Sequence, residues 1–175
     1  MEHRERKPLR LSGCDYAENG IYFITICTHH MQHTLCTIQC RGGPCGLPRT
    51  VLSPLGKLAE EAIGYIDSKE NVTVDHYVIM PNHIHLLIRL HTPFKVPPTE
   101  DICRIIGGYK SKVATDWFKA CKESGRVAGS VWQRSFMDHI IRNKADYLQH
   151  WQYIENNPLK WENDKYFTKN DISFW

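Results

Sequence analysis

The segment 72–90 constrains the fold more than any other part of this 175-residue chain. It consists of two runs rich in apolar and β-branched side chains, residues 72–80 and 83–90, which are joined at Pro81-Asn82. Runs of this length and composition are typical of β-strands, and the Pro-Asn pair indicates a tight bend or a bulge between them. We therefore predict two consecutive strands near the middle of the sequence.

The flanking segments predict the other elements. Residues 21–28 follow an Asn-Gly turn signal and are dense in β-branched and aromatic side chains, so they predict a strand, with which residues 35–40 can pair as a hairpin. Residues 41–49 are expected to form a loop. Ser53-Pro54 predicts the start of a helix whose apolar stripe continues to Ile66.

The C-terminal half adds three more predicted elements. An apolar stripe at helical spacing predicts a helix from about residue 101 to 119. Residues 131–141 predict a short strand or an irregular segment. Asn143 can cap a last helix, from Lys144 to about Asn156, which Pro158 ends.

The order of these elements is strand, strand, helix, strand, strand, helix, short strand, helix. Strand pairs with short connections form antiparallel sheets, and helices cover a face of such sheets. The predicted fold class is therefore α+β, a ferredoxin-like antiparallel sheet with helices on one face and the other face available for binding. The length predicts a single domain over residues 1–175, with a basic tail at residues 1–10.

Charge is distributed unevenly along the chain. Lysine and arginine number 22 and the acidic residues 19, for a net charge of +3. Residues 102–144 hold nine basic and three acidic residues, a local charge of +6, so the remainder is net acidic. A concentrated positive field suits a phosphate backbone, although solvated helix faces would show the same pattern.

The sequence argues against a membrane span and against secretion. Residues 19–40 carry no charge, but their three histidines would be costly in hydrocarbon. The charged N-terminus, MEHRERKPLR, lacks the apolar core of a signal peptide, so we expect cytoplasmic localisation and reduced cysteines. Cys36, Cys40 and Cys45 lie near three histidines, but at a spacing loose for zinc, so free thiols are favoured over a structural zinc site.

His83 and His85 are the first candidates for a chemical site. Alternate residues of a strand share a face, so both imidazoles should project from the same side, with Cβ atoms about 7 Å apart, while Ile84 faces the core. Two imidazoles at that spacing can bind one metal ion and leave it open for catalysis, but the ion needs at least one further ligand. The alternative is two half-exposed histidines without a ligand.

The last predicted helix supplies the further candidates. Its apolar side is predicted to consist of Tyr147, Leu148, Trp151 and Ile154. Tyr153 falls on the polar side, with Asn157 one turn later, so an amide oxygen can bind a hard cation beside a phenol. Because Asn157 precedes Pro158, it is biased away from helical conformation and the alignment is expected to be loose. The alternative for Tyr153 is an ordinary helix residue with its hydroxyl in water.

Five segments in this order closely resemble the REP-associated tyrosine transposases, which belong to the single-tyrosine HUH transposases of the insertion-sequence-200 type. The segments are LSPLGKLAEEAI, YVIMPNHIHLLI, IIGGYKSKV, VWQRSFMDHIIRN and YIENNPLKW. The resemblance extends from about Arg10 to Trp161. Its specific part is PNHIHLL followed about seventy residues later by IRN and YIENNP.

The resemblance implies a role for each candidate residue. His83 and His85 match the HUH pair of the family and would bind Mg²⁺ or Mn²⁺. Tyr153 would be the nucleophile, in preference to Tyr147, and Asn157 would complete the metal site. Family members have a ferredoxin-like fold and cleave and rejoin single-stranded DNA at hairpin-forming palindromes, through a 5′-phosphotyrosine intermediate.

The expected partner is single-stranded or hairpin DNA. Lys110, Lys112, Arg134 and Arg142 are candidate phosphate contacts, and Trp132 can stack on an unpaired base. Relatives include monomers and dimers that exchange the tyrosine helix, so a homodimer stays open. Two other functions compete: a hairpin nucleic-acid-binding protein that does not cleave, and a metal-dependent hydrolase resembling the histidine-triad family, against which Leu87 argues because it replaces the third alternating histidine.

Overall fold

The computed structural model describes residues 19–39, 48–91 and 101–167. The strands are β1 (Gly20–Cys27), β2 (Cys36–Gln39), β3 (Arg49–Leu52), β4 (Val72–Ile79), β5 (His83–Leu90) and β6 (Met137–Ile141). The helices are η1 (His29–Met31), α1 (Pro54–Asp67), α2 (Ile102–Glu123), α3 (Lys144–Asn156) and η2 (Pro158–Asn163). The basic tail, Cys40 and Cys45 fall outside the described residues. Within the described part of the chain, no helix has the length and apolar character needed to cross a membrane.

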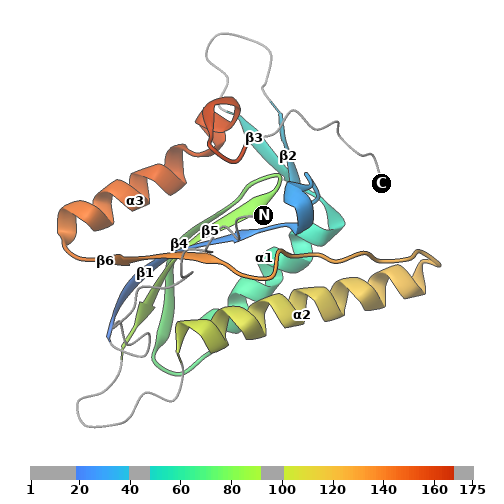
Figure 1. Cartoon of the computed structure of the whole chain (residues 1–175), viewed down its shortest axis with the longest axis horizontal. Helices are drawn as coiled ribbons and strands as arrows, with labels where there is room; N and C mark the ends of the chain where they lie inside the picture. The colour runs from blue at the N-terminus through green and yellow to red at the C-terminus, as the bar shows by residue number, and fades with distance from the viewer. Residues whose placement is uncertain (1–18, 40–47, 92–100, 168–175) are drawn as a thin grey trace, which may run out of the picture.

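Four strands form an antiparallel sheet in the order β4-β5-β1-β6. The chain passes from β1 through the β2-β3 pair and α1 to β4, and from β5 through α2 to β6. With the strand order given above, these two β-α-β units form a ferredoxin-like fold. The predicted α+β class is thereby confirmed. Figure 1 shows α1 and α2 on one side of this sheet and α3 on the other.

The face under α1 and α2 holds the main core. Alternate residues of β1 and β5, among them Ile24, Ile26 and Leu86, pack there against both helices. The predicted apolar stripe of α2 is buried along its whole length. The opposite face carries a smaller cluster, centred on Phe23, Leu87 and Ile154, which α3 covers. The prediction that helices cover one face only is therefore wrong, because the helix that bears Tyr153 partly closes the second face (Figure 1).

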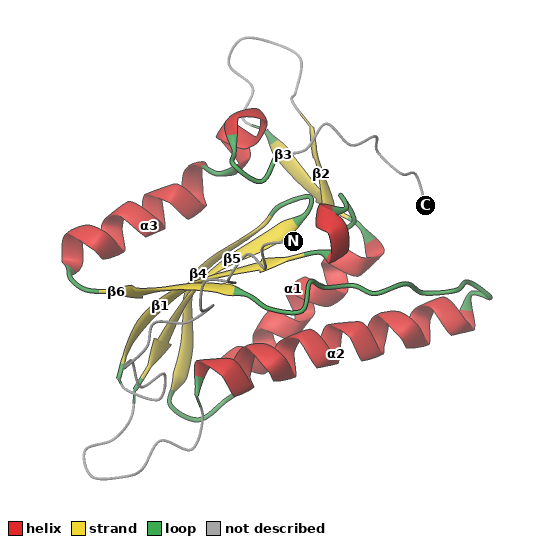
Figure 2. Cartoon of the chain, in the orientation of Figure 1, coloured by secondary structure: helices red, strands yellow, loops and turns green. Residues whose placement is uncertain are grey.

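β2 does not form the hairpin with the first strand that the sequence allows. β2 pairs with β3 in a separate two-stranded sheet, in which Cys36 is opposite Leu52 (Figure 2). The physical reason is that β1 has no free edge, because β5 and β6 occupy its two sides. Arg49, expected in a loop, belongs to β3. The Cys36 thiol is buried and donates to the carbonyl oxygen of Ile79 at 3.3 Å, as a free cysteine.

Side-chain caps define where the helices begin. The hydroxyl of Ser53 accepts a hydrogen bond from the Gly56 N–H at 2.9 Å, at the start of α1. Asn143 caps α3 in the same way, by accepting from the Asp146 N–H at 3.0 Å. Each cap satisfies a backbone donor that the first helical turn leaves without an intrahelical partner. The cap at Asn143 directs α3 back across the sheet immediately after β6.

A β-bulge between Val74 and His76 shapes the face under α3. Asp75 is the extra residue of the register, in which Val74 is opposite Ile88 and His76 opposite Leu87. A bulge re-aims side chains locally. Here it lets two successive residues reach α3: Asp75 accepts from the Tyr147 hydroxyl at 3.1 Å, and His76 pairs with Glu155 at 2.9 Å.

Candidate active site

His83 and His85 lie side by side on β5, on the face covered by α3. Their ring centroids are 4.5 Å apart, and both side chains are 0% exposed. Ile84 between them is buried in the main core, so the predicted alternation of faces is confirmed. The histidines are fully buried, which contradicts the alternative of two half-exposed side chains.

Hydrogen bonds orient both imidazoles. Nδ1 of His83 lies 2.8 Å from Oδ1 of Asn82, and Nδ1 of His85 lies 2.9 Å from Oγ1 of Thr25. The Asn82 amide nitrogen donates to the Tyr166 carbonyl oxygen at 2.7 Å, so its Oδ1 is the acceptor and His83 carries its proton on Nδ1. We assign the Nδ1 proton to His85 in the same way, with the Thr25 hydroxyl as its acceptor, because this tautomer leaves the unpartnered, buried Nε2 as a lone pair and not as an N–H donor. Each imidazole therefore keeps a lone pair on Nε2.

Burial holds both imidazoles in the neutral form. It lowers the pKa of His83 to about 4, an effect that the nearby Asp164 carboxylate opposes and Lys165 reinforces. Burial also lowers the pKa of His85 well below its ordinary value, with His83, Lys165 and His150 acting in the same direction. Neutral imidazole is the form that binds metal ions.

Tyr153 approaches the histidines from α3. Its ring centroid is 5.1 Å from that of His85 and 6.0 Å from that of Phe23. Its hydroxyl donates to Oδ2 of Asp164 at 2.9 Å. Burial, followed by the hydrogen bond to Asp164 and its charge, raises the pKa of Tyr153 above the ordinary value. The half-buried side chain lines an open cleft of about 570 Å³.

Asn157 completes the group one turn after Tyr153. Its φ and ψ are −59° and −45°, so it remains helical although Pro158 follows, and the alignment is tighter than the sequence predicts. Its amide nitrogen donates to Oδ2 of Asp164 at 3.0 Å. Its Oδ1 is buried and has no hydrogen-bond partner.

Three buried side-chain atoms without a partner thus belong to one site. Among the described residues they are Nε2 of His83, Nε2 of His85 and Oδ1 of Asn157. A buried polar atom without a partner is costly, and such atoms usually mark a bound ion or water. Two imidazole nitrogens and an amide oxygen, all neutral and all with free lone pairs, fit a divalent metal ion.

Asp164, Thr25 and Asn82 are members of this site that the sequence analysis missed. Asp164 follows η2 and accepts from Tyr153, Asn157 and the Tyr166 N–H, the last at 2.7 Å. No periodic pattern marks Asp164, because a chain reversal brings it to the site. Thr25 could have been identified from the sequence, because it is a polar residue on the same face of β1 as Phe23, in a strand of mostly apolar residues.

Tyr147 lies away from the histidines. Its hydroxyl bonds to Asp75, which also pairs with Arg89. The predicted apolar side of α3 is wrong at Leu148, which is 46% exposed. The helix is rotated so that His150 and Tyr153 contact Phe23 on the sheet, and this rotation turns Leu148 to solvent.

The candidate DNA contacts lie along α2 and the segment before β6. Arg134, Arg142 and Lys112 are exposed, and Lys112 pairs with Asp116 at 3.0 Å. Trp132 is half-buried and donates its indole N–H to the Lys110 carbonyl oxygen at 3.2 Å. The Lys110 ammonium donates to the carbonyl oxygens of residues 133, 134 and 135, at 2.6, 3.3 and 3.2 Å. Lys110 therefore has an internal role, in ordering the chain before β6. Lys160 and Lys165, which the sequence analysis did not select, line the cleft at Tyr153.

Comparison with known proteins gives the family. Residues 49–157 match the family model described as Transposase IS200 like. The chain belongs to the IS200-like transposase family. An uncharacterized protein of Haemophilus influenzae (strain ATCC 51907 / DSM 11121 / KW20 / Rd) is 31% identical over 179 residues, which cover 93% of each chain. A REP-associated tyrosine transposase of Escherichia coli (strain K12) is 22% identical over 147 residues, which cover 83% of this chain and 70% of the relative.

A solved structure agrees with this membership. A REP-associated tyrosine transposase bound to a REP hairpin matches with a TM-score of 0.52 and 18% identity, over 100% of this chain and 95% of the other. At this identity the likeness supports the ferredoxin-like fold alone. The family recognised from the five sequence segments is confirmed. IS200-like transposases are DNA-cleaving enzymes, and the family suggests a divalent metal ion as cofactor.

Proposed function

We propose that this IS200-like transposase cleaves and rejoins single-stranded DNA at hairpin-forming sites through a covalent bond between Tyr153 and a DNA 5′-phosphate. One observation carries the proposal. Three buried atoms on His83, His85 and Asn157 have no hydrogen-bond partner, and the ring of Tyr153, which lines an open cleft, lies 5.1 Å from that of His85. A divalent metal ion next to a nucleophile promotes phosphodiester cleavage by stabilising the negative charge on the phosphate oxygens.

The three atoms would hold the cofactor. A Mg²⁺ or Mn²⁺ ion bound there would withdraw charge from the oxygens of the scissile phosphate. Thr25 and Asn82 keep the Nε2 lone pairs available, because they accept the Nδ1 protons. The amide oxygen of Asn157 is the oxygen ligand of the set, since its amide nitrogen is already bonded to Asp164.

In the proposed reaction the Tyr153 oxygen forms a bond to phosphorus while the bond between phosphorus and the 3′-oxygen breaks. The phenol proton passes to Asp164, whose carboxylate already accepts that hydrogen bond at 2.9 Å. The departing 3′-oxygen takes a proton from water and becomes a DNA 3′-hydroxyl. Because one phosphodiester bond replaces another, a 3′-hydroxyl of a second strand can reverse the reaction, and no ATP is needed.

The DNA strand would follow the cleft beside α3. Lys160 and Lys165 line this cleft with Tyr153 and are suited to contact backbone phosphates. Lys112, Arg134 and Arg142 would contact the hairpin stem, and Trp132 would stack on an unpaired base. The solved relative bound to a REP hairpin is the reason for proposing a hairpin as the partner.

The test is to incubate the full chain with a labelled single-stranded hairpin oligonucleotide and Mn²⁺ or Mg²⁺, and to separate the products on a denaturing gel. We expect a covalent protein–DNA adduct that disappears with a chelator and in Tyr153→Phe. Tyr147→Phe is the matched control, because it removes a hydroxyl from the same helix but away from the histidines, and it should keep the adduct.

Two results would contradict the proposal. An adduct that persists in Tyr153→Phe would mean that another residue is the nucleophile. Binding of the hairpin with no adduct under any metal condition would support instead a hairpin-binding protein that does not cleave.

A further inference from the structure

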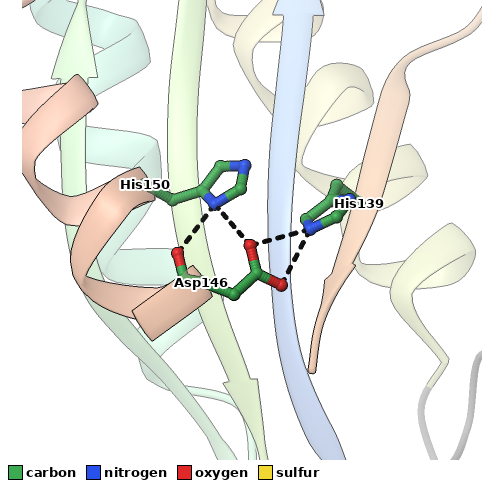
Figure 3. A group of neighbouring side chains, drawn as sticks. All are labelled: His139, Asp146 and His150. Carbon is green, nitrogen blue, oxygen red and sulfur yellow. Dashed lines mark hydrogen bonds and ion pairs between the residues drawn. The ribbon is translucent and has the colours of Figure 1, made fainter. Parts of the chain in front are cut away.

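A second cluster of metal-ligating side chains lies where β6 passes into α3. His139 comes from β6, and Asp146 and His150 lie one turn apart on α3. Figure 3 shows the Asp146 carboxylate joined by dashed lines to a ring nitrogen of each histidine. None of these residues belongs to the site formed by His83, His85 and Asn157.

The distances within this cluster are close to those of a metal site. The Nε2 atom of His139 is 3.1 and 3.0 Å from the two Asp146 carboxylate oxygens, and Nδ1 of His150 is 3.1 Å from Oδ1. All three ligand atoms lie within 4.8 Å of one another. Around a tetrahedral Zn²⁺ with bonds of about 2.0 Å, ligand atoms are about 3.3 Å apart. Small shifts would therefore suffice to replace the hydrogen bonds by bonds to an ion.

Surrounding contacts hold the cluster in place. The Arg142 N–H donates to Asp146 at 2.9 Å, which fixes the carboxylate. The His139 and His150 rings are stacked, with centroids 4.7 Å apart. The side chains are 43%, 17% and 19% exposed for His139, Asp146 and His150, so an ion can enter from solvent. Nδ1 of His150 also bonds to the Asp146 carbonyl oxygen at 2.9 Å, and this bond would be given up on metal binding.

We propose that His139, Asp146 and His150 bind Zn²⁺ and that the ion ties the tyrosine helix α3 to the edge strand β6. Two imidazoles and one carboxylate are a ligand set that Zn²⁺ commonly takes in proteins. Three protein ligands leave a fourth position for water.

The tie matters because α3 is held weakly by apolar contacts. Ile154 is its only buried residue. His150 packs against Phe23 at a ring distance of 4.6 Å, and Phe23 stacks on His85 at 5.0 Å. A Zn²⁺ ion at Asp146 and His150 would therefore fix the helix beside the candidate active site, at the end nearest β6.

The test measures metal binding and does not depend on DNA cleavage. The metal-free full chain is dialysed against Zn²⁺ in excess Mg²⁺, and bound zinc is measured by atomic emission. Both His139→Gln and Asp146→Asn should bind one equivalent less than the unmodified chain. The matched control is His76→Gln, which removes an imidazole that also joins a strand to a carboxylate of α3, but without a third ligand. This variant should bind as much zinc as the unmodified chain.

Hydrogen exchange tests the tie itself. Zn²⁺ should slow amide exchange in residues 144–156 of the unmodified chain and of His76→Gln, but not of His139→Gln. Equal zinc content in the unmodified chain and in both cluster variants would overturn the site. Zinc binding at the cluster with unchanged amide exchange in α3 would contradict the proposal that the ion holds α3 to β6. Since none of these readouts involves DNA, they are separate from a failure of the cleavage proposal.

Discussion

Single hydrogen bonds determine what the candidate active site can bind. An imidazole offers one lone pair, and the partner of its other nitrogen decides where that lone pair lies. Thr25 and Asn82 accept the Nδ1 protons of His85 and His83, so both Nε2 atoms are directed into the site. Such outer partners contribute to metal affinity without touching the metal.

Thr25→Val tests this orientation, because valine has nearly the shape of threonine but no acceptor for the His85 proton. We expect the affinity for Mn²⁺ to fall by about 10–100-fold, the usual effect of losing an outer partner. The measurement is calorimetric titration of the full chain. Thr73→Val, at an exposed position on β4, is the control and should leave the affinity unchanged. An equal affinity in both variants would show that Thr25 does not orient His85.

Asp164→Asn separates proton acceptance from hydrogen bonding. An asparagine oxygen can still accept from the Tyr153 hydroxyl, but it cannot take up the proton at neutral pH. We expect the rate of adduct formation to fall by about 10²–10⁴-fold, the range for loss of a general base. The rate is read from a time course on denaturing gels. Glu162→Gln, an exposed change two residues earlier, should keep the rate. A rate unchanged in Asp164→Asn would mean that the proton goes elsewhere.

At the scale of elements, α1 is seated against the segment before β2. A Cβ atom at Gly56 would lie 1.9 Å from the carbonyl oxygen of Leu35, which also accepts from the Ser53 N–H at 2.9 Å. The first turn of α1 therefore requires a residue without a side chain. A Cβ at Gly64, farther along the same helix, would meet nothing within 4 Å.

The two glycines of α1 should respond in opposite directions to alanine. Gly56→Ala forces a backbone shift, so we expect the free energy of unfolding to fall by about 1–3 kcal/mol or more. Gly64 lies in a helix interior, where alanine fits, and Gly64→Ala lowers the conformational freedom of the unfolded chain. We therefore expect the free energy of unfolding to rise by about 0.5–1 kcal/mol. Urea unfolding of both variants measures the change. Equal effects would contradict the close approach to Leu35.

Local patterns predicted the elements, whereas their partners depended on contacts distant in sequence. The apolar stripe of α2 and the caps at Ser53 and Asn143 are properties of neighbouring residues, and the structure has them as predicted. The pairing of β2 could not be predicted, because it depends on both edges of β1 being occupied. The internal role of Lys110 depends on carbonyl groups more than twenty residues away. Asp164 reaches the site only through the chain reversal after α3.

At the scale of the whole molecule, the two faces of the sheet differ in how much apolar surface is packed against them. The face under α1 and α2 contains an extensive apolar core. The cluster under α3 is smaller, with Phe23, Leu87 and Ile154 as its buried members among the described residues. Polar contacts at the bulge and at β6 supply much of the remaining attachment of α3. The helix with Tyr153 thus buries fewer residues than α1 or α2.

This inequality predicts that α3 opens without global unfolding. The free energy of local opening follows the apolar contact that opening removes, so the amides of α3 should exchange with solvent at a lower free energy than those of α2. Native-state hydrogen exchange of the metal-free chain, read by mass spectrometry, measures both helices in one experiment. Ile154→Ala removes the one buried side chain of α3 and should speed exchange in α3 while leaving α2 unchanged. Equal protection of the two helices would mean that the sheet holds α3 as firmly as its core, and that the tyrosine moves only when the whole domain unfolds.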